Sequence, residues 1–315
     1  MRVPAERILI VLLGAIGDVV RALPLANRLR AGYPRAQIAW AVEPRAAPLL
    51  EHHPALDARL VFERSGGATA FWRFLRRVRA QGFDLALDLQ RHAKSGLVSF
   101  ASAAPIRIGF DRRNAKELNW LWNTHRIERV EPRGWKLEQY LRFGALLELP
   151  ESPIAFDITL TAAEETRVTA LLAPLARPFA AFFVGSTWES RLWFPKGFAA
   201  VADALDALGL DAVLLGGSDA SASASATSAR ARVAVGPDSG PMHLAAAAGT
   251  PVVSLWGATT PARSAPYGSE DLVLVGRVAC APCYLRQCPI GRQCMEAITP
   301  ARVLAQVARV LEGRR

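Results

Sequence analysis

The stretch ILIVLLGAIGD, residues 8–18, decides the fold class of this chain. Its first six residues are all apolar, which is typical of a strand buried on both faces of a sheet. The short turn GAIG at 14–17 follows, and an amphipathic helix is predicted from about Asp18 to Arg30, ended by Gly32. A buried strand that leads directly into a helix is the first unit of a parallel α/β sheet.

The same alternation continues along the chain and predicts an α/β protein with doubly wound sheets. A Pro-bounded segment near 150–158 separates two series of similar size, so we expect domains at 1–155 and 156–315 with a cleft between them. The closing helix is expected to bury Val303, Leu304, Val307 and Val310, either within the second domain or back on the first. Further strands are predicted at 37–42, 84–89, 106–110, 179–184, 212–215, 233–235 and 252–255, and further helices at 70–81, 162–172, 196–208, 241–248 and 300–311.

One segment of the second series departs from this alternation. Residues 220–229 read ASASASATSA, a low-complexity run without apolar periodicity. A doubly wound domain would need a helix and another strand at this place. We therefore interpret the run either as a flexible loop or as a site where the sequence is shortened or altered.

Composition excludes several classes of protein. Of the 315 residues, 51% are hydrophobic and 21% are charged, which indicates a folded globular chain. No run of about 18 residues is apolar enough for a membrane span, and the start at Met1–Arg7 does not resemble a secretory signal. We expect a cytoplasmic protein. All four cysteines lie between Cys280 and Cys294, which is not the distribution of a disulfide-stabilised secreted domain.

The net charge of +10 is concentrated in the first half of the chain. Residues 1–157 hold 24 Lys and Arg against 16 Asp and Glu, whereas residues 158–315 hold 14 against 12. The first half is therefore expected to face an anion, which could be nucleic acid, a membrane surface or a phosphorylated substrate.

Three loops follow predicted strands, and parallel sheets place ligands at such carboxyl ends. The 14–18 turn lacks the third glycine of the dinucleotide fingerprint, and spacing alone leaves Asp18 as either a helix N-cap or a functional carboxylate. The segment GPDSGPMH at 236–243 enters a helix near Pro241 and is typical of a phosphate site, although a simple capped turn with a structural His243 fits too. The third loop, 185–193, has two hydroxyls and Arg191, whose guanidinium matches phosphate oxygens.

The cysteines have the spacing Cys280-x2-Cys283-x4-Cys288-x5-Cys294. A tetrahedral metal site is one interpretation, but structural zinc sites usually have two separated CxxC pairs. Reduced thiols that pack in the fold, or a redox-labile pair, are the alternatives.

Several of these segments together resemble the heptosyltransferase group of bacterial glycosyltransferase family 9. The resemblance extends almost from end to end, and the DSGPMH block together with the GDV turn is specific at this separation. It rests on LLGAIGDVVRALPLANRLR, DLQRHAKSG at 88–96, RIGFDRR at 107–113, WESRLWFP at 188–195, GPDSGPMHLAAAAGTPVVSLWGATTPARSAPYG at 236–268, and the tail CAPC…CPIG…CM…ITPARV.

The resemblance implies a GT-B architecture, in which two Rossmann-like domains face each other across the active site. It implies inverting transfer of heptose from ADP-L-glycero-D-manno-heptose to the lipopolysaccharide inner core, onto Kdo-lipid A or a heptosyl acceptor. By position, Asp18 matches the catalytic base. The donor-binding residues implied are Ser186, Thr187, Arg191, Asp238, Ser239, Gly240 and His243.

Two positions depart from the family pattern. The family usually has lysine where this chain has Arg191, which keeps the charge and changes its geometry. The Ala/Ser run replaces a longer strand and helix, so that Asp219 is the remaining candidate for the acidic residue that contacts the ribose.

The expected partners are the nucleotide-sugar donor and an anionic glycolipid acceptor at the inner face of the inner membrane, where the protein would attach peripherally. No cofactor and no obligatory metal are expected. The alternatives are transfer of another nucleotide-activated sugar and, from a different class, a nucleic-acid-binding protein that would use the arginines near Trp120, Trp122 and Trp135. The acceptor residues we expect are Arg91, Lys94, Arg112, Arg113 and Lys116.

Overall fold

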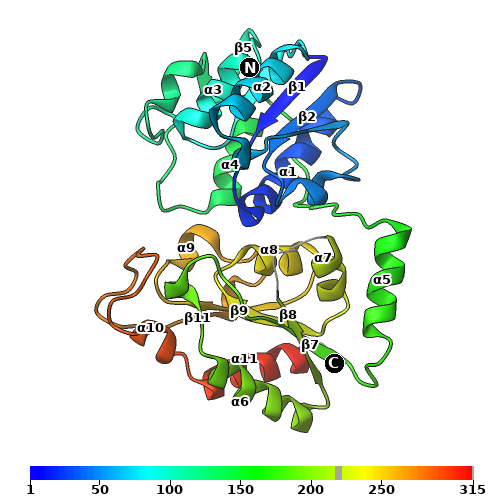
Figure 1. Ribbon diagram of the computed structural model, residues 1–315, viewed down its shortest axis with the longest axis vertical. Coiled ribbons are helices and arrows are strands. Elements are labelled where there is room, and N and C mark those ends of the chain that lie inside the picture. The colour runs from blue at the N-terminus through cyan, green and yellow to red at the C-terminus, as the bar shows by residue number, and fades with distance from the viewer. Residues whose placement is uncertain (217–221, 314–315) are drawn as a thin grey trace. The chain divides into compact units, whose positions relative to one another are not determined.

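The structure is a computed structural model that describes residues 1–216 and 222–313. It divides into two compact units, unit 1 at Met1–Thr159 and unit 2 at Leu160–Arg315, and each has its own parallel sheet (Figure 1). Each sheet with its covering helices forms a Rossmann-like domain. In the described part of the chain, no helix has the length and apolar character that crossing a bilayer requires.

Unit 1 contains a six-stranded sheet in the order β3-β2-β1-β4-β5-β6, which includes the strand order of a Rossmann domain. Alternate residues of β1 point to opposite faces, so Leu9 and Val11 pack with the α2 and α3 side while Ile8 and Ile10 are buried on the other face. The strands are β1 Arg7–Val11, β2 Gln37–Val42, β3 Ala58–Val61, β4 Leu85–Asp88, β5 Ile106–Gly109 and β6 His125–Arg126. The helices are α1 Ile16–Gly32, α2 Gly67–Arg79, α3 Ala93–Ala101 and α4 Lys136–Leu146, with short 3₁₀ turns at Ala47–Leu50, Arg64–Gly66 and Asn119–Trp122.

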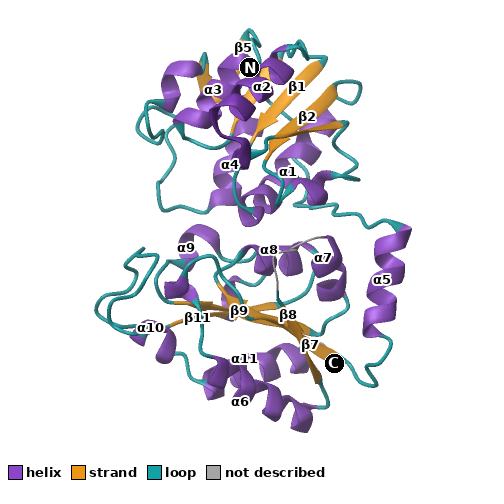
Figure 2. Ribbon diagram, in the orientation of Figure 1, coloured by secondary structure: helices purple, strands orange, loops and turns teal. Residues whose placement is uncertain are grey.

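Unit 2 contains a five-stranded sheet in the order β11-β10-β9-β7-β8, which is the flavodoxin-like order 2-1-3-4-5 read from its other edge. Helices α6 and α11 cover one face, and α7 and α8 cover the other (Figure 2). The strands are β7 Phe179–Phe183, β8 Asp211–Leu215, β9 Val233–Pro237, β10 Val252–Trp256 and β11 Val273–Val275. The helices are α5 Ala162–Leu172, α6 Pro195–Leu205, α7 Ala222–Ala229, α8 Gly240–Ala247, α9 Pro261–Ser264, α10 Gln293–Glu296 and α11 Pro300–Glu312, with 3₁₀ turns at Glu189–Arg191, Asp206–Leu208 and Glu270–Leu272.

The closing helix α11 belongs to the core of unit 2. Its residues Val303, Val307 and Val310 are buried with Phe182 of β7 and Val235 of β9. The amphipathic stripe predicted for this helix therefore packs on the sheet of its own unit.

The interpretation of this run as a flexible loop is wrong for residues 222–229, because Ala222–Ala229 forms α7. Alanine has the highest helix propensity, and the buried stretch from Ser225 to Ser228 packs between α8 and α5. The hydroxyl of Thr250 donates to the carbonyl of Ser228 at 2.6 Å and fixes the end of the helix. Apolar periodicity did not predict this helix, because its small residues from Ser225 to Ser228 are buried without an apolar stripe.

Candidate active site

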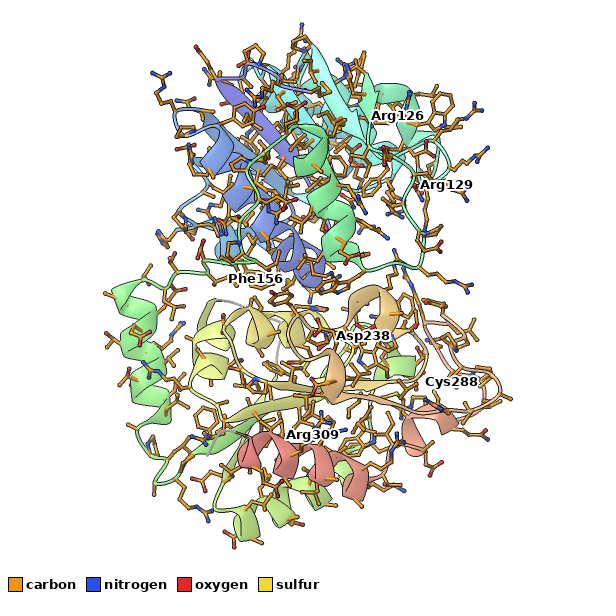
Figure 3. All side chains as sticks on the ribbon, turned by 180° about the vertical axis from the view of Figure 1, so that it is seen from behind. Arg126, Arg129, Phe156, Asp238, Cys288 and Arg309 are labelled. Carbon is orange, nitrogen blue, oxygen red and sulfur yellow. The ribbon has the colours of Figure 1, made fainter. Side chains whose placement is uncertain are left out.

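The donor-binding candidates of unit 2 come together at one edge of the sheet. Strand β9 lies between β7 and β10, so the segments that follow these three parallel strands leave the sheet side by side. They carry Arg191 after β7, Asp238 after β9, and Thr259 after β10. Figure 3 shows Asp238 at this edge, on the face of the sheet opposite α11.

Asp238 joins the three segments through polar contacts. Its carboxylate oxygen Oδ2 pairs with Arg191 Nη1 at 3.2 Å and accepts a hydrogen bond from Thr259 Oγ1 at 2.7 Å. The hydroxyl of Ser186 donates to its backbone carbonyl at 3.0 Å. Asp238 is only 8% exposed, so its ion pair with Arg191 is largely shielded from water and holds the guanidinium in one orientation. The Trp188 ring also lies 3.9 Å from this guanidinium.

The N-terminus of α8 lies directly beside this cluster. Ser239 is the N-cap residue and Gly240 the first helical residue, and the Ser239 hydroxyl oxygen is buried without a hydrogen-bond partner among the described residues. The helix start leaves backbone N–H groups that attract an anion. A side chain at Gly236 would lie 2.6 Å from the Phe183 carbonyl, so only glycine allows β9 to approach β7 this closely before the turn.

The remaining donor candidates differ in exposure. Thr187 is exposed in the loop after β7, whereas His243 is only 5% exposed on α8. Asp219 lies outside the described residues. The predicted start of the helix at Pro241 is off by one residue, because α8 begins at Gly240.

Asp18 occupies the corresponding edge of the sheet in unit 1. Helix α1 begins at Ile16 with Ala15 as its N-cap, so the predicted start at Asp18 is wrong and the capping interpretation of its side chain is excluded. The Asp18 oxygen Oδ1 pairs with Lys136 Nζ and with Arg21 Nη2, each at 2.5 Å. These cations come from the start of α4 and from one turn further along α1.

The two cations determine the protonation state of Asp18. Burial raises the pKa of this carboxyl, but the Lys136 ammonium and the Arg21 guanidinium lower it more strongly, and the net pKa lies well below the ordinary value. Asp18 is therefore ionised throughout the neutral pH range. Its side chain is 22% exposed, which leaves it accessible to a substrate.

These features agree with what the chain is similar to. The family model for glycosyltransferase family 9 (heptosyltransferase) matches residues 71–233 and 222–293. The chain belongs to this family. It is 22% identical over 290 residues to lipopolysaccharide core heptosyltransferase OpsX of Haemophilus influenzae, covering 83% of this chain and 82% of that protein. It is 25% identical over 324 residues to lipopolysaccharide heptosyltransferase 1 of Pseudomonas aeruginosa, covering 90% and 87%.

A solved structure supports the fold assignment. The structure of E. coli heptosyltransferase WaaC with ADP matches with a TM-score of 0.76 at 19% identity, covering 96% of this chain and 99% of that one. The resemblance predicted from the sequence motifs is confirmed at the level of family and fold, and the chain is a glycosyltransferase.

The acceptor candidates of this glycosyltransferase lie in the loops after β4 and β5, except Lys94, which lies in α3. Arg91 has its guanidinium 4.0 Å from the Phe110 ring and donates to Gln139 Oε1, and its carbonyl accepts from the Lys116 N–H at 2.8 Å. Arg112, Arg113 and Lys116 are exposed, and Arg112 lies 4.4 Å from the Trp120 ring. Lys94 is partly buried in the first turn of α3, where its ammonium lies 5.1 Å from the Phe62 ring.

The cysteine segment does not form a metal-ligand cluster in the structure. Within residues 1–216 and 222–313, no three His, Cys, Asp or Glu side chains are grouped to hold a metal ion. All four thiols are free: Cys280 is exposed, Cys283 and Cys288 are half-buried, and Cys294 is buried. Cys294 packs closely on Gly257, because a β-carbon at residue 257 would lie 2.6 Å from the Cys294 sulfur. Burial raises the pKa of the Cys294 thiol.

Sequence reasoning missed three side chains of these clusters: Arg21, Lys136 and Thr259. Arg21 could have been found, because a basic residue three positions after an acid on a helix faces it. Lys136 is 118 residues from Asp18 in sequence, so no local pattern indicates their contact.

Proposed function

We propose that this protein is an inverting heptosyltransferase that transfers heptose from ADP-L-glycero-D-manno-heptose to the inner core of lipopolysaccharide. The observation that carries the proposal is the presence of two clusters with complementary chemistry. Unit 2 has a cation and a helix N-terminus suited to a diphosphate, and unit 1 has an ionised carboxylate at the end of its first strand. Family membership and the relatives' activities support the same reaction.

The donor would bind by its diphosphate to Arg191 and the N-terminus of α8. Both groups are positive or partly positive, and charge on the β-phosphate oxygens increases as the bond to the sugar breaks. They would thus stabilise the departing ADP more strongly in the transition state than in the ground state. Ser186, Thr187 and Ser239 contribute hydroxyls beside this position.

The acceptor hydroxyl would attack the anomeric carbon as the bond from that carbon to the phosphate oxygen breaks. Its proton passes to the Asp18 carboxylate, and ADP leaves with the electron pair. Paired with two cations, Asp18 has a low proton affinity. An acceptor phosphate or carboxylate that draws Lys136 away would raise this affinity at the moment when a base is needed.

The acceptor proposed is an anionic glycolipid, with the protein attached peripherally to the inner face of the inner membrane. The exposed cations Arg112, Arg113 and Lys116 lie beside exposed apolar side chains, since Leu118 is 61% and Leu121 is 55% exposed. Basic and apolar side chains together suit the headgroup region of an anionic leaflet.

Asp18→Asn tests the catalytic assignment. The amide has nearly the same size but cannot accept the proton, so turnover should fall by about 10²–10⁴-fold, measured as ADP release with a heptose donor and an inner-core acceptor. ADP affinity measured by calorimetry should be unchanged. Turnover within a few-fold of the unaltered enzyme would refute Asp18 as the base. Faster release of the nucleoside diphosphate from another nucleotide sugar would refute the heptose donor.

A further inference from the structure

The loop that carries three of the four cysteines contacts the turn Glu189–Arg191, called here the donor-binding turn because it contains the donor candidate Arg191. This loop, residues 276–292, joins β11 to α10, and Figure 3 shows Cys288 at its outer part. Ser190, in the middle of the turn Glu189–Arg191, is 1% exposed because it binds this loop twice. Its N–H donates to the Arg286 carbonyl at 3.1 Å and its hydroxyl donates to the Leu285 carbonyl at 2.5 Å.

An ion pair fixes the two ends of the same turn. Arg292 Nε pairs with Glu189 Oε1 at 3.2 Å, and the other carboxylate oxygen accepts from the Cys288 N–H at 3.2 Å. Arg292 Nη1 also donates to the Leu192 carbonyl at 3.0 Å, and the guanidinium lies 4.6 Å from the Phe194 ring. A single side chain therefore contacts the residues on both sides of Arg191.

The backbone of Arg292 lies in the left-handed region. It adopts φ 61° and ψ 41°, the left-handed region that favours glycine, and it directly follows Gly291 at φ 77°. A non-glycine residue in this region is strained and persists where surrounding contacts compensate. The Arg292 side chain, 19% exposed, supplies such contacts to the donor-binding turn.

We propose that Arg292 and Glu189 are positioning residues that hold Trp188 and Arg191 in the conformation that receives the donor diphosphate. The proposal depends on the assignment of Arg191 to donor binding made above. A turn already ordered before binding loses less conformational entropy when ADP binds, and this increases affinity. The cysteine-bearing loop is then a support for donor recognition.

Arg292→Gly separates positioning from a structural role. Glycine removes the side chain and relieves the left-handed backbone, so the melting temperature should not fall, whereas the calorimetric dissociation constant for ADP should rise about 5- to 10-fold. Arg292→Lys keeps the charge without the fork of donors and should give an intermediate value. The matched control is Arg309→Ala, which removes an exposed pair with Asp271 on the face of the sheet opposite Asp238 (Figure 3) and should leave ADP affinity unchanged.

Arg191→Ala and the double variant with Arg292→Gly complete the experiment. If positioning acts through Arg191, adding Arg292→Gly to Arg191→Ala should weaken ADP binding by less than about twofold more. Unaltered ADP affinity in Arg191→Ala would refute the donor assignment itself. The positioning role alone would be refuted if Arg191→Ala weakened ADP binding and Arg292→Gly did not. It would also be refuted if the losses of ADP affinity in the two single variants added fully in the double variant.

Discussion

Two aspartates at the carboxyl edge of the first sheet have environments that move their pKa values in opposite directions. Asp18 is held by two cations and its pKa falls, as described above. Asp88, at the end of β4, is 0% exposed, and burial raises its pKa although Asn119 Nδ2 donates to it at 2.6 Å and the Gln90 N–H at 3.1 Å. Cations, rather than neutral donors, therefore determine which of these carboxyls is the stronger acid.

Asp88→Asn should change the pH dependence of stability. Because the folded pKa of Asp88 is raised, its stabilising contribution is complete below the ordinary value of 3.8 and is lost as pH rises through the folded pKa. The asparagine variant lacks this loss. The urea midpoint of the unaltered protein should exceed that of the variant by the largest amount near pH 4, and this difference should shrink toward pH 8. A difference that grows with pH would contradict the raised pKa.

At the scale of elements, local pattern predicted those strands and helices whose own residues are continuously apolar or periodic. Strands β1, β7 and β10 are of this kind, whereas the short β3, reading ARLV, is only partly buried and was not predicted. Helix α4 was not predicted, although Leu137, Tyr140 and Phe143 have helical spacing and are buried. The two donor loops and the Asp18 turn could be predicted from strand ends, but the Asp18–Lys136 contact depends on the packing of α4 against α1.

Strand β8 lies at one end of the strand order of the second sheet. In the part of the chain that the structure describes, β8 pairs with β7 alone and is an edge strand, and Leu214 is 65% exposed on it. Strand β7, one position inward, is buried at every residue. Both faces of the sheet are therefore buried at β7 but not at β8.

This gradient predicts very different costs for two substitutions. Phe182→Ala in β7 removes a ring that contacts Phe198 at 5.9 Å between centroids and should lower the free energy of unfolding by about 3–5 kcal/mol. Leu214→Thr should change it by no more than about 0.5 kcal/mol, because threonine suits an exposed strand. Both are measured by urea denaturation. A comparable loss for Leu214→Thr would show that a partner covers the β8 edge.

At the scale of the whole molecule, the excess positive charge belongs to unit 1. Within residues 91–142, eleven Lys and Arg occur against five Asp and Glu. Two of these arginines contact Trp120: Arg112 lies 4.4 Å and Arg126 5.5 Å from its ring, and Arg126 donates to its carbonyl at 3.0 Å. Figure 3 shows Arg126 and Arg129 on the same side of unit 1. Part of the positive charge therefore lies against Trp120, which is close in sequence to the exposed Leu118 and Leu121.

This basic surface predicts a specific defect in acceptor use. Lys94→Ala combined with Arg112→Ala should raise the acceptor KM without changing ADP affinity, because both residues lie in unit 1 and the donor cluster lies in unit 2. Arg73→Ala combined with Arg77→Ala removes the same charge from exposed positions on α2 and should leave the acceptor KM unchanged.

Membrane attachment through the same surface should depend on salt. Each basic residue near an anionic leaflet contributes about 1 kcal/mol, and this attraction is screened as the Debye length shrinks from about 30 Å at 0.01 M salt to about 3 Å at 1 M. Sedimentation with vesicles containing anionic lipid should therefore recover the protein at low salt and lose it at high salt, and the Lys94/Arg112 double variant should bind less than the unaltered protein at low salt. Vesicle binding that does not change with salt concentration would show that these cations only make the surface hydrophilic. A double variant with unaltered acceptor KM and unaltered vesicle binding would show the same.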